Sequence, residues 1–493
     1  MKNLKPYLPI LLHTLLLFPA FLCHHAATWY IRVYGDIGFD AIMYTILSSL
    51  GGMSESLFYN FLKSVLLPAA AWTIAILLIL HCSKIKKLIT NTIVIMLIIV
   101  LLCTAASTVG LISYLKNTIT QTKIFETTYV DPKEVDITFL EEKRNLIYIY
   151  LESMENTFFG ESEGGAMEEN IIQELYQLAE EYVNFSQNDT VGGFEPVSGT
   201  TWTAGALVGQ TAGIPLKTPS NIKDMHNGYG KEGVFLPGIT TLSDILHENG
   251  YLQSFMVGSR ASFGGRRTYY KTHGTDYIYE LSTARMEGIV EPDYFVWWGM
   301  EDKYLFEYAK EKITWMNRRA EPFAFTMLTV DTHHVDGYVC EYCRNEHEEQ
   351  YENVFSCSSR QVAEFIKWIQ EQDFYEDTTV IIAGDHLSMD RRYMLENVDE
   401  SYDRRVYNCF INAAAETELA EDIYSKNREF CTLDMFPTTL AAMGCNIEGD
   451  RLGLGTNLFS DKPTLIEEMG YEEFNSQIGM RSEYYKREFL REE

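Results

Sequence analysis

Basic residues are scarce in most of this 493-residue chain. It contains 40 Lys and Arg residues against 69 Asp and Glu, which gives a formal net charge of −29. The deficit is uneven, because residues 1–115 carry +4 and the remainder carries −33. The acidic charge of residues 116–493 argues against nucleic acid as a partner, since phosphate backbones attract basic surfaces. It does not exclude an anionic lipid, because a local metal ion or arginine can outweigh a distant field.

Charged residues are nearly absent from three apolar runs near the N-terminus, residues 7–23, 61–80 and 89–112. A helix needs about 20 such residues to cross a bilayer, so each run is a candidate membrane span. The first run is short and interrupted by prolines, so the alternative interpretation is that it forms a signal peptide that is cleaved. No clear small-residue cleavage site follows it and two further runs come after it, so we expect it to be retained.

Basic residues cluster at two places beside these runs, the N-terminus and the short loop between the second and third runs. They are Lys2, Lys5, Lys84, Lys86 and Lys87. Because basic segments tend to stay on the cytoplasmic side, both places are predicted to be cytoplasmic. With three spans, everything after the third run is then extracytoplasmic. We therefore expect a multi-pass protein of the plasma membrane.

The segment between the first two runs decides this topology. Residues 37–50 alternate apolar and polar side chains, and Asp36 and Asp40 interrupt the apolar character. A carboxylate inside the membrane is costly, so we interpret the segment as interfacial rather than as a fourth span. A fourth span would place the large domain in the cytoplasm.

The rest of the chain is predicted to form an α/β domain behind a juxtamembrane helix and linker. The expected boundaries are 1–114 for the membrane region, 115–143 for the linker and 144–493 for the domain. Strands are expected at 145–151, 253–257, 322–330 and 379–383, and helices at 168–182, 238–250, 358–372 and 430–444. Such alternation of strands and helices indicates a mostly parallel central sheet covered on both faces.

Polar side chains follow three of the expected strands. Glu152 comes after the first, His333 and His334 come after the third, and Asp385 and His386 come after the last. Open α/β sheets place their sites at the carboxyl ends of strands, so these groups are expected to meet. Taken singly, each is as readily a helix cap or a structural pair. Together with a threonine oxygen, they form a plausible ligand set for a divalent metal ion.

A further candidate lies in residues 198–216, SGTTWTAGALVGQTAGIPL, where a turn leads into an expected helix. The turn holds three threonines, Thr200, Thr201 and Thr203. Unpaired N–H groups and the helix dipole favour negative charge at such a place, which suits a nucleophile that attacks phosphate. The alternative is an ordinary Ser/Thr N-cap.

Six sequence blocks carry a resemblance to a known family. In chain order they are IYIYLES, GTTWTAGALVGQTAGIPL, FGGRRTYYKTHG, LTVDTHH, TTVIIAGDHLSMD and RLGLGTNLF, all within residues 145–460. With its membrane region, the chain resembles the membrane-anchored phosphoglycerol transferases of the alkaline phosphatase and sulfatase superfamily, which include the lipoteichoic acid synthases. The GTTWT and THH blocks resemble the glucan phosphoglycerol transferase branch more closely.

The resemblance implies a metal site and a nucleophile. Glu152, Thr203, Asp385 and His386 match the family's metal ligands, and Thr203 also matches its catalytic threonine. Thr203 is preferred over its neighbouring threonines because of its distance to the Ile-Pro-Leu block. One divalent ion is expected, with Mn²⁺ favoured and Mg²⁺ or Zn²⁺ as alternatives, because mixed oxygen and nitrogen ligands suit all three.

The resemblance also implies substrate-binding residues. Arg266 matches the phosphate-binding arginine and His333 the substrate histidine, with His334 as an alternative for the same role. Lipoteichoic acid synthases have a tryptophan two residues before that arginine, where this chain has Gly264. Packing around the glycerol is therefore expected to differ here, and the acceptor with it.

The implied reaction is transfer of phosphoglycerol from phosphatidylglycerol to an extracytoplasmic glycan or teichoic-type acceptor, through a covalent intermediate on threonine. One alternative is a membrane-bound phosphoethanolamine transferase. Another is a phosphodiesterase or sulfatase, although the C/S-x-P-x-R block of sulfatases is missing around Thr203. A third alternative is a membrane-anchored binding protein, which the intact set of expected ligands disfavours.

Three cysteines lie close together in sequence, with Cys340 and Cys343 preceding Cys357. Oxidation outside the cytoplasm favours a disulfide from Cys357 to either of the other two. The alternative is a small zinc site that includes His347.

A glycine-rich stretch near the C-terminus, residues 451–459, invites a phosphate-binding interpretation. Phosphate-cradling loops of this composition follow a strand, and no strand is expected before this one. We therefore predict a packing turn.

Overall fold

The computed structural model describes residues 8–35, 38–47, 59–82, 86–218, 233–414 and 425–490. The chain forms two compact units. The first contains Met1–Phe39, Met53–Lys116 and Met389–Arg392, and the second contains Asp40–Gly52, Asn117–Ser388 and Tyr393–Glu493. Lys2, Lys5, Lys84, Asp36 and, of the segment 37–50, residues 37 and 48–50 lie outside the described residues.

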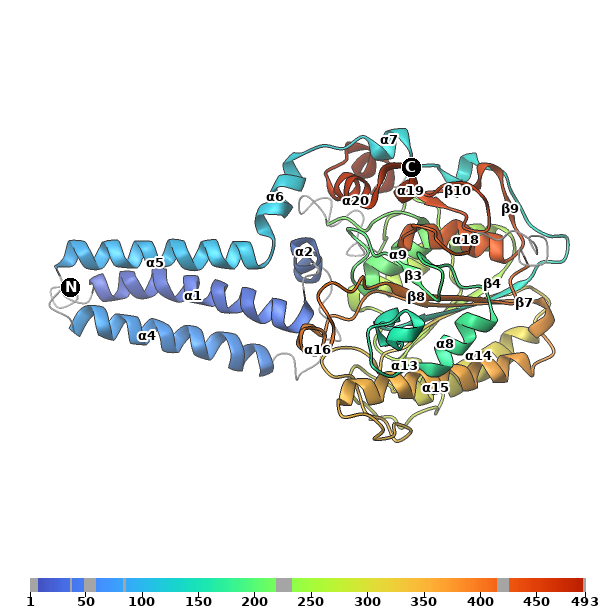
Figure 1. Cartoon of the computed structure of the whole chain (residues 1–493), viewed down its shortest axis with the longest axis horizontal. Helices are drawn as coiled ribbons and strands as arrows, with labels where there is room; N and C mark the ends of the chain where they lie inside the picture. The colour runs from blue at the N-terminus through green and yellow to red at the C-terminus, as the bar shows by residue number, and fades with distance from the viewer. Residues whose placement is uncertain are drawn as a thin grey trace. The chain divides into compact units, whose positions relative to one another are not determined.

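The first unit is built from three long apolar helices (Figure 1). They are α1 (Leu8–Tyr34), the stretch Tyr59–Cys82 that includes η1 (Leu62–Leu66) and α4 (Leu67–Cys82), and α5 (Lys87–Thr108). Each is long and apolar enough to cross a membrane. α1 packs against both of the others around Leu17, Ala20 and Val94. Their outer faces are also apolar, which suits contact with lipid.

A polar contact joins the three helices inside this unit. His13 on α1 lies 3.3 Å from His81 on α4, and its Nε2 donates to the Asn91 side-chain oxygen of α5 at 3.1 Å. Buried polar groups in a helix bundle need such partners, because lipid offers none. After α5 the chain turns at Gly110 into α6 (Leu111–Ile119), so the third apolar run is divided between two helices.

The second unit is organised around a seven-stranded sheet with the order β3-β8-β7-β2-β6-β4-β5. Its strands are β2 (Asn145–Leu151), β3 (Gly193–Phe194), β4 (Leu252–Val257), β5 (Tyr277–Tyr279), β6 (Phe323–Leu328), β7 (Thr378–Gly384) and β8 (Val406–Ile411). Five of them, from β7 to β5, are parallel, whereas β8 runs antiparallel to β7 and β3 antiparallel to β8. The carboxyl ends of the five parallel strands therefore share one edge.

Helices cover both faces of this sheet (Figure 1). One face carries α8 (Gln173–Glu181), α14 (Asp302–Asn317) and α15 (Gln350–Gln370), and the other carries α9 (Thr203–Ala212) and α18 (Met435–Ala442). Strand β2 is buried on both sides: Ile147 and Ile149 enter the core beneath α15, and the Tyr148 hydroxyl donates to Gln210 of α9. A strand covered on both faces must be apolar throughout, as β2 is.

The predicted fold class is confirmed: apolar N-terminal helices precede an α/β domain with a mostly parallel central sheet. Several elements differ from expectation. Strands β3, β5 and β8 and the helix α14 were not predicted, and α15 starts at Gln350 rather than at residue 358. Its first turns contain Tyr351, Val354 and Phe355, all buried, so helical spacing begins eight residues earlier than the composition indicated.

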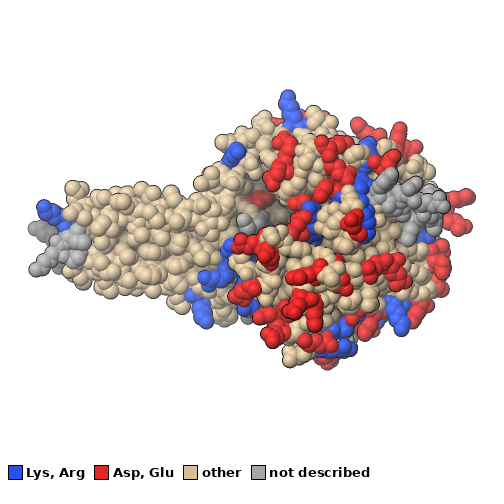
Figure 2. All heavy atoms as spheres, in the orientation of Figure 1, with Lys and Arg blue, Asp and Glu red and all other residues tan. Residues whose placement is uncertain are grey.

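The surface charge differs between the two units. On the face shown in Figure 2, acidic side chains dominate the surface of the second unit, and the sides of the three apolar helices carry almost no charge. This surface carries the acidic excess that the composition predicts.

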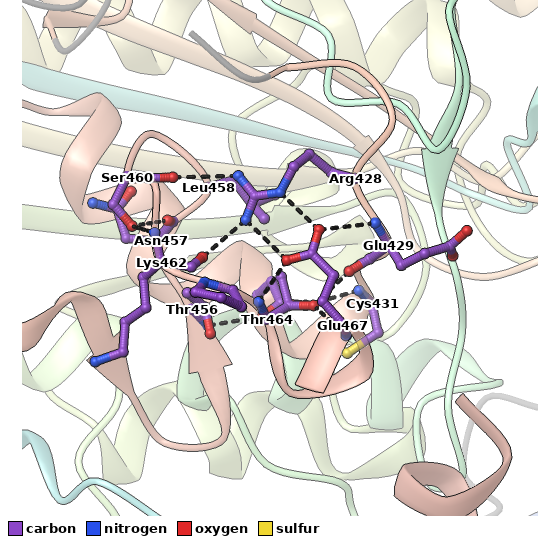
Figure 3. A network of polar contacts seen from close by, with 12 residues as sticks. Arg428, Glu429, Cys431, Thr456, Asn457, Leu458, Ser460, Lys462, Thr464 and Glu467 are labelled. Carbon is purple, nitrogen blue, oxygen red and sulfur yellow. Dashed lines mark hydrogen bonds and ion pairs between the residues drawn. The ribbon is translucent and has the colours of Figure 1, made fainter. Parts of the chain in front are cut away.

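The glycine-rich stretch forms a hairpin of β10 (Arg451–Leu452) and β11 (Gly455–Thr456), followed by a turn. A side chain at Gly455 would place its Cβ 2.1 Å from the Leu433 carbonyl, so only glycine permits this close approach. Beyond the hairpin, the Arg428 guanidinium binds the Glu467 carboxylate at 2.8 Å and the Ser460 carbonyl at 3.2 Å (Figure 3). The close approach of Gly455 to Leu433 packs the hairpin against the residues before α18, as expected of a packing turn.

Candidate active site

Three ligand-type side chains meet at the carboxyl ends of β2 and β7. Because these strands are parallel and pair Leu151 with Gly384, the residues that follow them lie side by side. The His386 Nε2 lies 3.5 Å from a Glu152 carboxylate oxygen and 3.4 Å from the Asp385 Oδ2. All three residues are buried. We call them the Glu–Asp–His cluster.

The turn after β2 holds this cluster in place. Ser153 adopts a left-handed backbone with φ 57°, which is uncommon for a residue other than glycine and is found at sites that need a particular geometry. Its N–H donates to Asp385 Oδ1 and its hydroxyl to the Glu152 carboxylate, both at 2.8 Å. The Thr329 hydroxyl, from the end of the neighbouring strand, accepts the Glu152 N–H at 3.0 Å.

The polar atoms of the cluster fit a divalent cation. His386 Nδ1 donates to the Leu387 carbonyl at 2.8 Å, so its Nε2 faces the two carboxylates as an acceptor. Asp385 Oδ2 is buried, and none of the described residues donates a hydrogen bond to it. Burial and, next, the Glu152 carboxylate raise the pKa of Asp385 to about 6. Burial alone would lower the pKa of His386, but Asp385 and Glu152 outweigh it and raise it. A dication would neutralise this repulsion.

Thr203 approaches the cluster from α9, which covers one face of the sheet. It is the first residue of α9, and its Oγ1 lies 3.4 Å from His386 Nε2. The N-cap is Trp202, without a side-chain capping bond, so Thr203 is not the ordinary N-cap considered above. The Thr200 hydroxyl is engaged within the turn, where it donates to the Val197 carbonyl at 2.8 Å. Of these two, only Thr203 is in hydrogen-bond range of the cluster.

Arg266 follows β4 and begins α12 (Arg266–Thr272). Its guanidinium is buried and donates to the Phe263 carbonyl and to the Ser259 hydroxyl, both at 3.0 Å. Burial lowers the pKa of Arg266 to about 10, whereas Glu152 and Asp385 raise it, so this cation feels the field of the cluster. It stays charged at neutral pH.

Both histidines that follow β6 stay neutral near pH 7. Burial lowers the pKa of His333 to about 4 and holds that of His334 well below its usual value. His333 Nδ1 donates to the His334 carbonyl at 2.8 Å, which leaves Nε2 as its proton acceptor. The electrostatic influence of His386, Asp385 and Arg266 on His333 places it in the same environment as the cluster.

Aromatic side chains that the sequence did not single out stand beside these groups. The Trp298 ring lies 4.6 Å from the His333 ring and 5.6 Å from the Phe263 ring, and Phe263 in turn lies under the Arg266 guanidinium. Gly264 has φ 64°, a backbone that a tryptophan rarely adopts. The chain thus supplies aromatic surface from Trp298 and Phe263 rather than from position 264.

A tyrosine from the segment between the first two apolar helices also reaches this region. Tyr44 lies on α2 (Phe39–Leu47), in the part of that helix that belongs to the second unit. Its hydroxyl donates to the Gly264 carbonyl at 2.7 Å, and its ring lies 5.8 Å from that of Trp202. It therefore contacts Gly264, two residues before Arg266, and Trp202, the residue before Thr203. Nothing in the local sequence pattern signals such a contact.

Comparison with known proteins identifies relatives of the second unit. The sequence pattern of the sulfatase family matches residues 144–445. Phosphoglycerol transferase I of Xanthomonas campestris pv. campestris (strain B100) is 31% identical over 256 residues, which are 51% of this chain and 34% of that protein. Phosphoglycerol transferase I of Salmonella paratyphi B is 32% identical over 266 residues, 52% of this chain and 32% of that protein. The chain thus spans about a third of the length of these curated relatives.

Solved structures agree at the level of the fold. The lipoteichoic acid synthase LtaP of Listeria monocytogenes superimposes with a TM-score of 0.50 at 17% identity, covering 66% of this chain and 79% of that one. The lipooligosaccharide phosphoethanolamine transferase EptA of Neisseria meningitidis gives 0.53 at 14% identity, covering 88% and 84%. Enzymes of this superfamily use a divalent metal ion, for which the Glu–Asp–His cluster has suitable ligands. By its matched domain and the architecture of its sheet, the chain belongs to the sulfatase family of the alkaline phosphatase superfamily.

Proposed function

We propose that this protein transfers phosphoglycerol from phosphatidylglycerol to an extracytoplasmic glycan or teichoic-type acceptor. The observation that carries the proposal is Thr203 Oγ1, at the start of α9 and 3.4 Å from His386 Nε2 within the Glu–Asp–His cluster. A hydroxyl at a helix start beside a cation site is suited to attack phosphorus. The curated relatives bear the name of the same activity.

One divalent cation would be held by Glu152, Asp385, His386 and Thr203. Mn²⁺ is the favoured ion, with Mg²⁺ and Zn²⁺ as alternatives, because the donor set mixes carboxylate, hydroxyl and imidazole. When bound, such an ion lowers the pKa of a coordinated hydroxyl and neutralises charge on a phosphoryl group.

In the first half-reaction, Thr203 Oγ1 forms a bond to the phosphorus of phosphatidylglycerol. The bond from phosphorus to the diacylglycerol oxygen breaks, and glycerophosphate remains attached to Thr203. The threonine proton passes to His333 Nε2 and then to the departing diacylglycerol oxygen. Since burial lowers the pKa of His333 to about 4, the protonated imidazole gives up this proton readily.

The second half-reaction reverses these roles. His333 Nε2 takes the proton from a hydroxyl of the acceptor, whose oxygen attacks the phosphorus. The bond between phosphorus and Thr203 breaks, and the proton returns to Thr203 Oγ1. Arg266 binds the non-bridging phosphoryl oxygens in both steps, because a planar guanidinium matches two oxygens at once.

A lipid donor agrees with the three apolar helices, which anchor the protein in a membrane. In the proposed topology the N-terminus and the loop near Lys86 are cytoplasmic, and the second unit is extracytoplasmic. Reporter fusions at the N-terminus, near residue 86 and after residue 480 test it. A cytoplasmic signal from the last fusion would contradict both the topology and the use of an external acceptor.

The reaction itself is tested with the full chain in detergent micelles that contain phosphatidylglycerol or, in a parallel sample, phosphatidylethanolamine, and no acceptor. We expect release of diacylglycerol and a glycerophosphate adduct on the peptide that contains Thr203. An adduct formed instead from phosphatidylethanolamine would identify a phosphoethanolamine transferase. Free glycerophosphate without dependence on Thr203 would identify a hydrolase, and no turnover of either lipid would favour a binding protein.

A further inference from the structure

A second group of metal-ligating side chains lies outside the Glu–Asp–His cluster. It consists of Cys340 and Cys343, in the segment after β6, and Cys357 on α15. Cys340 and Cys357 are buried and Cys343 is half-buried, and all three are free thiols in the structure. The Cys340 Sγ lies 3.7 Å from each of the other two sulfur atoms. We call this group the cysteine cluster.

The spacing of these sulfur atoms matches ligands that share a cation. A disulfide joins two sulfurs at about 2.05 Å, so the disulfide expected from the sequence is not formed here. Four ligands at about 2.3 Å around a tetrahedral zinc ion lie about 3.8 Å from one another. Two of the three sulfur pairs are at 3.7 Å, and all ligand atoms lie within 4.8 Å of one another.

Hydrogen-bond donors around the cluster favour thiolates. The Gln361 side-chain N–H, one turn after Cys357 on α15, lies 3.4 Å from the Cys357 sulfur and 4.0 Å from that of Cys340. Donors of this kind surround the sulfur ligands of metal sites and disperse their negative charge.

The cluster joins an irregular segment to a fixed helix. Among the described residues, those from 329 to 349 form neither helix nor strand. This segment carries His333 and His334 near its start and the first two cysteines in its middle. Long irregular segments inside a compact domain need additional ties, and α15 is anchored in the core by Val362 and Phe365. A link from the segment to Cys357 would hold it against that helix.

We propose that Cys340, Cys343 and Cys357 bind one thiophilic divalent cation of the Zn²⁺ class at a structural site. Thiolate ligands select such ions over Mg²⁺ or Mn²⁺, so this site and the Glu–Asp–His cluster would take different metals. The structure groups the three sulfur atoms without a fourth protein ligand among the described residues. The fourth ligand is therefore water or His347, which is half-buried and follows Cys343 by four residues.

The site is tested with the full chain, purified in detergent without reductant or added metal. Total zinc is measured for the wild type and for Cys343→Ser, with Cys445→Ser as a control, since that buried thiol lies outside the cluster. We expect the first variant to contain one equivalent less than the wild type and the control to match it. Equal zinc contents in wild type and Cys343→Ser would overturn the proposal. A lower zinc content in His347→Ala would assign the fourth ligand, and an unchanged content would assign water.

Two measurements on the wild type keep the test independent of how the variants fold. Thiols are titrated after denaturation with a chelator: a metal site yields all nine cysteines as free thiols, whereas a disulfide within the cluster yields two fewer and overturns the proposal. Replacement of zinc by Co²⁺ should give the intense near-ultraviolet charge-transfer band of thiolate ligation. The oxygen and nitrogen ligands of the Glu–Asp–His cluster do not produce this band, so its absence would also overturn the proposal.

Discussion

The Glu–Asp–His cluster and the cysteine cluster lie in one unit but are held in place differently. The first stands at the ends of β2 and β7, whose mutual position is fixed by the hydrogen bonds of a parallel ladder. The second joins a segment without regular structure to α15, so its geometry depends on the path of that segment. Groups mounted on strands are positioned more accurately than groups on loops.

The chemistry of the two clusters follows the same division. Oxygen and nitrogen ligands at the strand ends, with Thr203 and Arg266 beside them, suit a reaction that needs preorganised charge. Sulfur ligands that join a segment to a helix suit a structural link, because zinc bound by thiolates contributes to the free energy of folding. Variants should therefore affect activity at one cluster and stability at the other, and the predictions below test that separation.

The largest effect is expected from Thr203→Ala. Removing the nucleophile should lower transfer activity by about four orders of magnitude, since other residues act through it. The free energy of unfolding should change by less than the roughly 1 kcal/mol that loss of an N-cap costs, because Thr203 is not the N-cap of α9. Lipid turnover and thermal denaturation of the same preparation give the two values.

Two further variants test whether the loss is specific to the Thr203 hydroxyl. Thr203→Ser should keep part of the activity because the hydroxyl survives, whereas Thr200→Ala should act mainly on stability, since that hydroxyl is bonded within the turn. An active Thr203→Ala variant with the glycerophosphate adduct on another residue would contradict the assignment of Thr203 as the nucleophile.

Asp385→Asn should come next, with activity reduced about 1000-fold and the metal of the Glu–Asp–His cluster lost. The amide keeps an oxygen for the N–H groups of Ser153 and His386 but removes the negative charge that a cation needs. Metal analysis should show that zinc bound by the cysteine cluster is unaffected.

A matched control for this variant is Asp434→Asn. Asp434 is also buried, accepts two backbone N–H groups and has a pKa that burial raises to about 6, but it lies outside both clusters. Its variant should retain all bound metal. Equal metal loss in both variants would mean that the loss reports general unfolding.

Arg266→Lys is expected to lower activity about 100-fold while leaving both metals bound. Lysine keeps the charge but presents no planar pair of donors to the phosphoryl oxygens. Arg267→Lys is the control, because Arg267 is partly exposed and pairs with Glu280 at 2.8 Å. Steady-state kinetics on phosphatidylglycerol separate the two, and similar losses in both would argue against a phosphate-binding role for Arg266.

The sequence allowed prediction of much of the Glu–Asp–His cluster, because strand ends in a parallel sheet share an edge. Glu152, Asp385 and His386 each follow an apolar run, and the sheet topology brings them together without further information. Thr203 could not be separated from Thr200 by residue type alone. The difference lies in which hydroxyl the turn engages, and that depends on contacts such as the one between Thr200 and Thr432.

Other features of the site had no sequence signal. Trp298 lies beside His333 through the path of an irregular segment, which follows no periodic pattern. The cysteine spacing predicted proximity correctly but did not distinguish a disulfide from a metal site, because both need sulfurs close together. The start of α15 was missed because two polar residues separate Tyr351 from Val354 in its first turn, so the helical spacing there rests on few apolar residues.

The smallest effect is expected from Tyr44→Phe. This variant tests whether the catalytic region extends beyond the Glu–Asp–His cluster. The substitution removes one hydrogen bond to the Gly264 carbonyl and keeps the ring beside Trp202. A single hydrogen bond contributes about 1 kcal/mol, so kcat/KM for phosphatidylglycerol should fall by at most about fivefold. Because Tyr44 contacts the loop before Arg266 rather than any reacting atom, the change should appear mainly in KM. Tyr251→Phe, which loses a bond of similar length to the Arg144 carbonyl, is the control and should leave KM unchanged. Equal KM values for Tyr44→Phe and the wild type would confine the functional region to the strand ends.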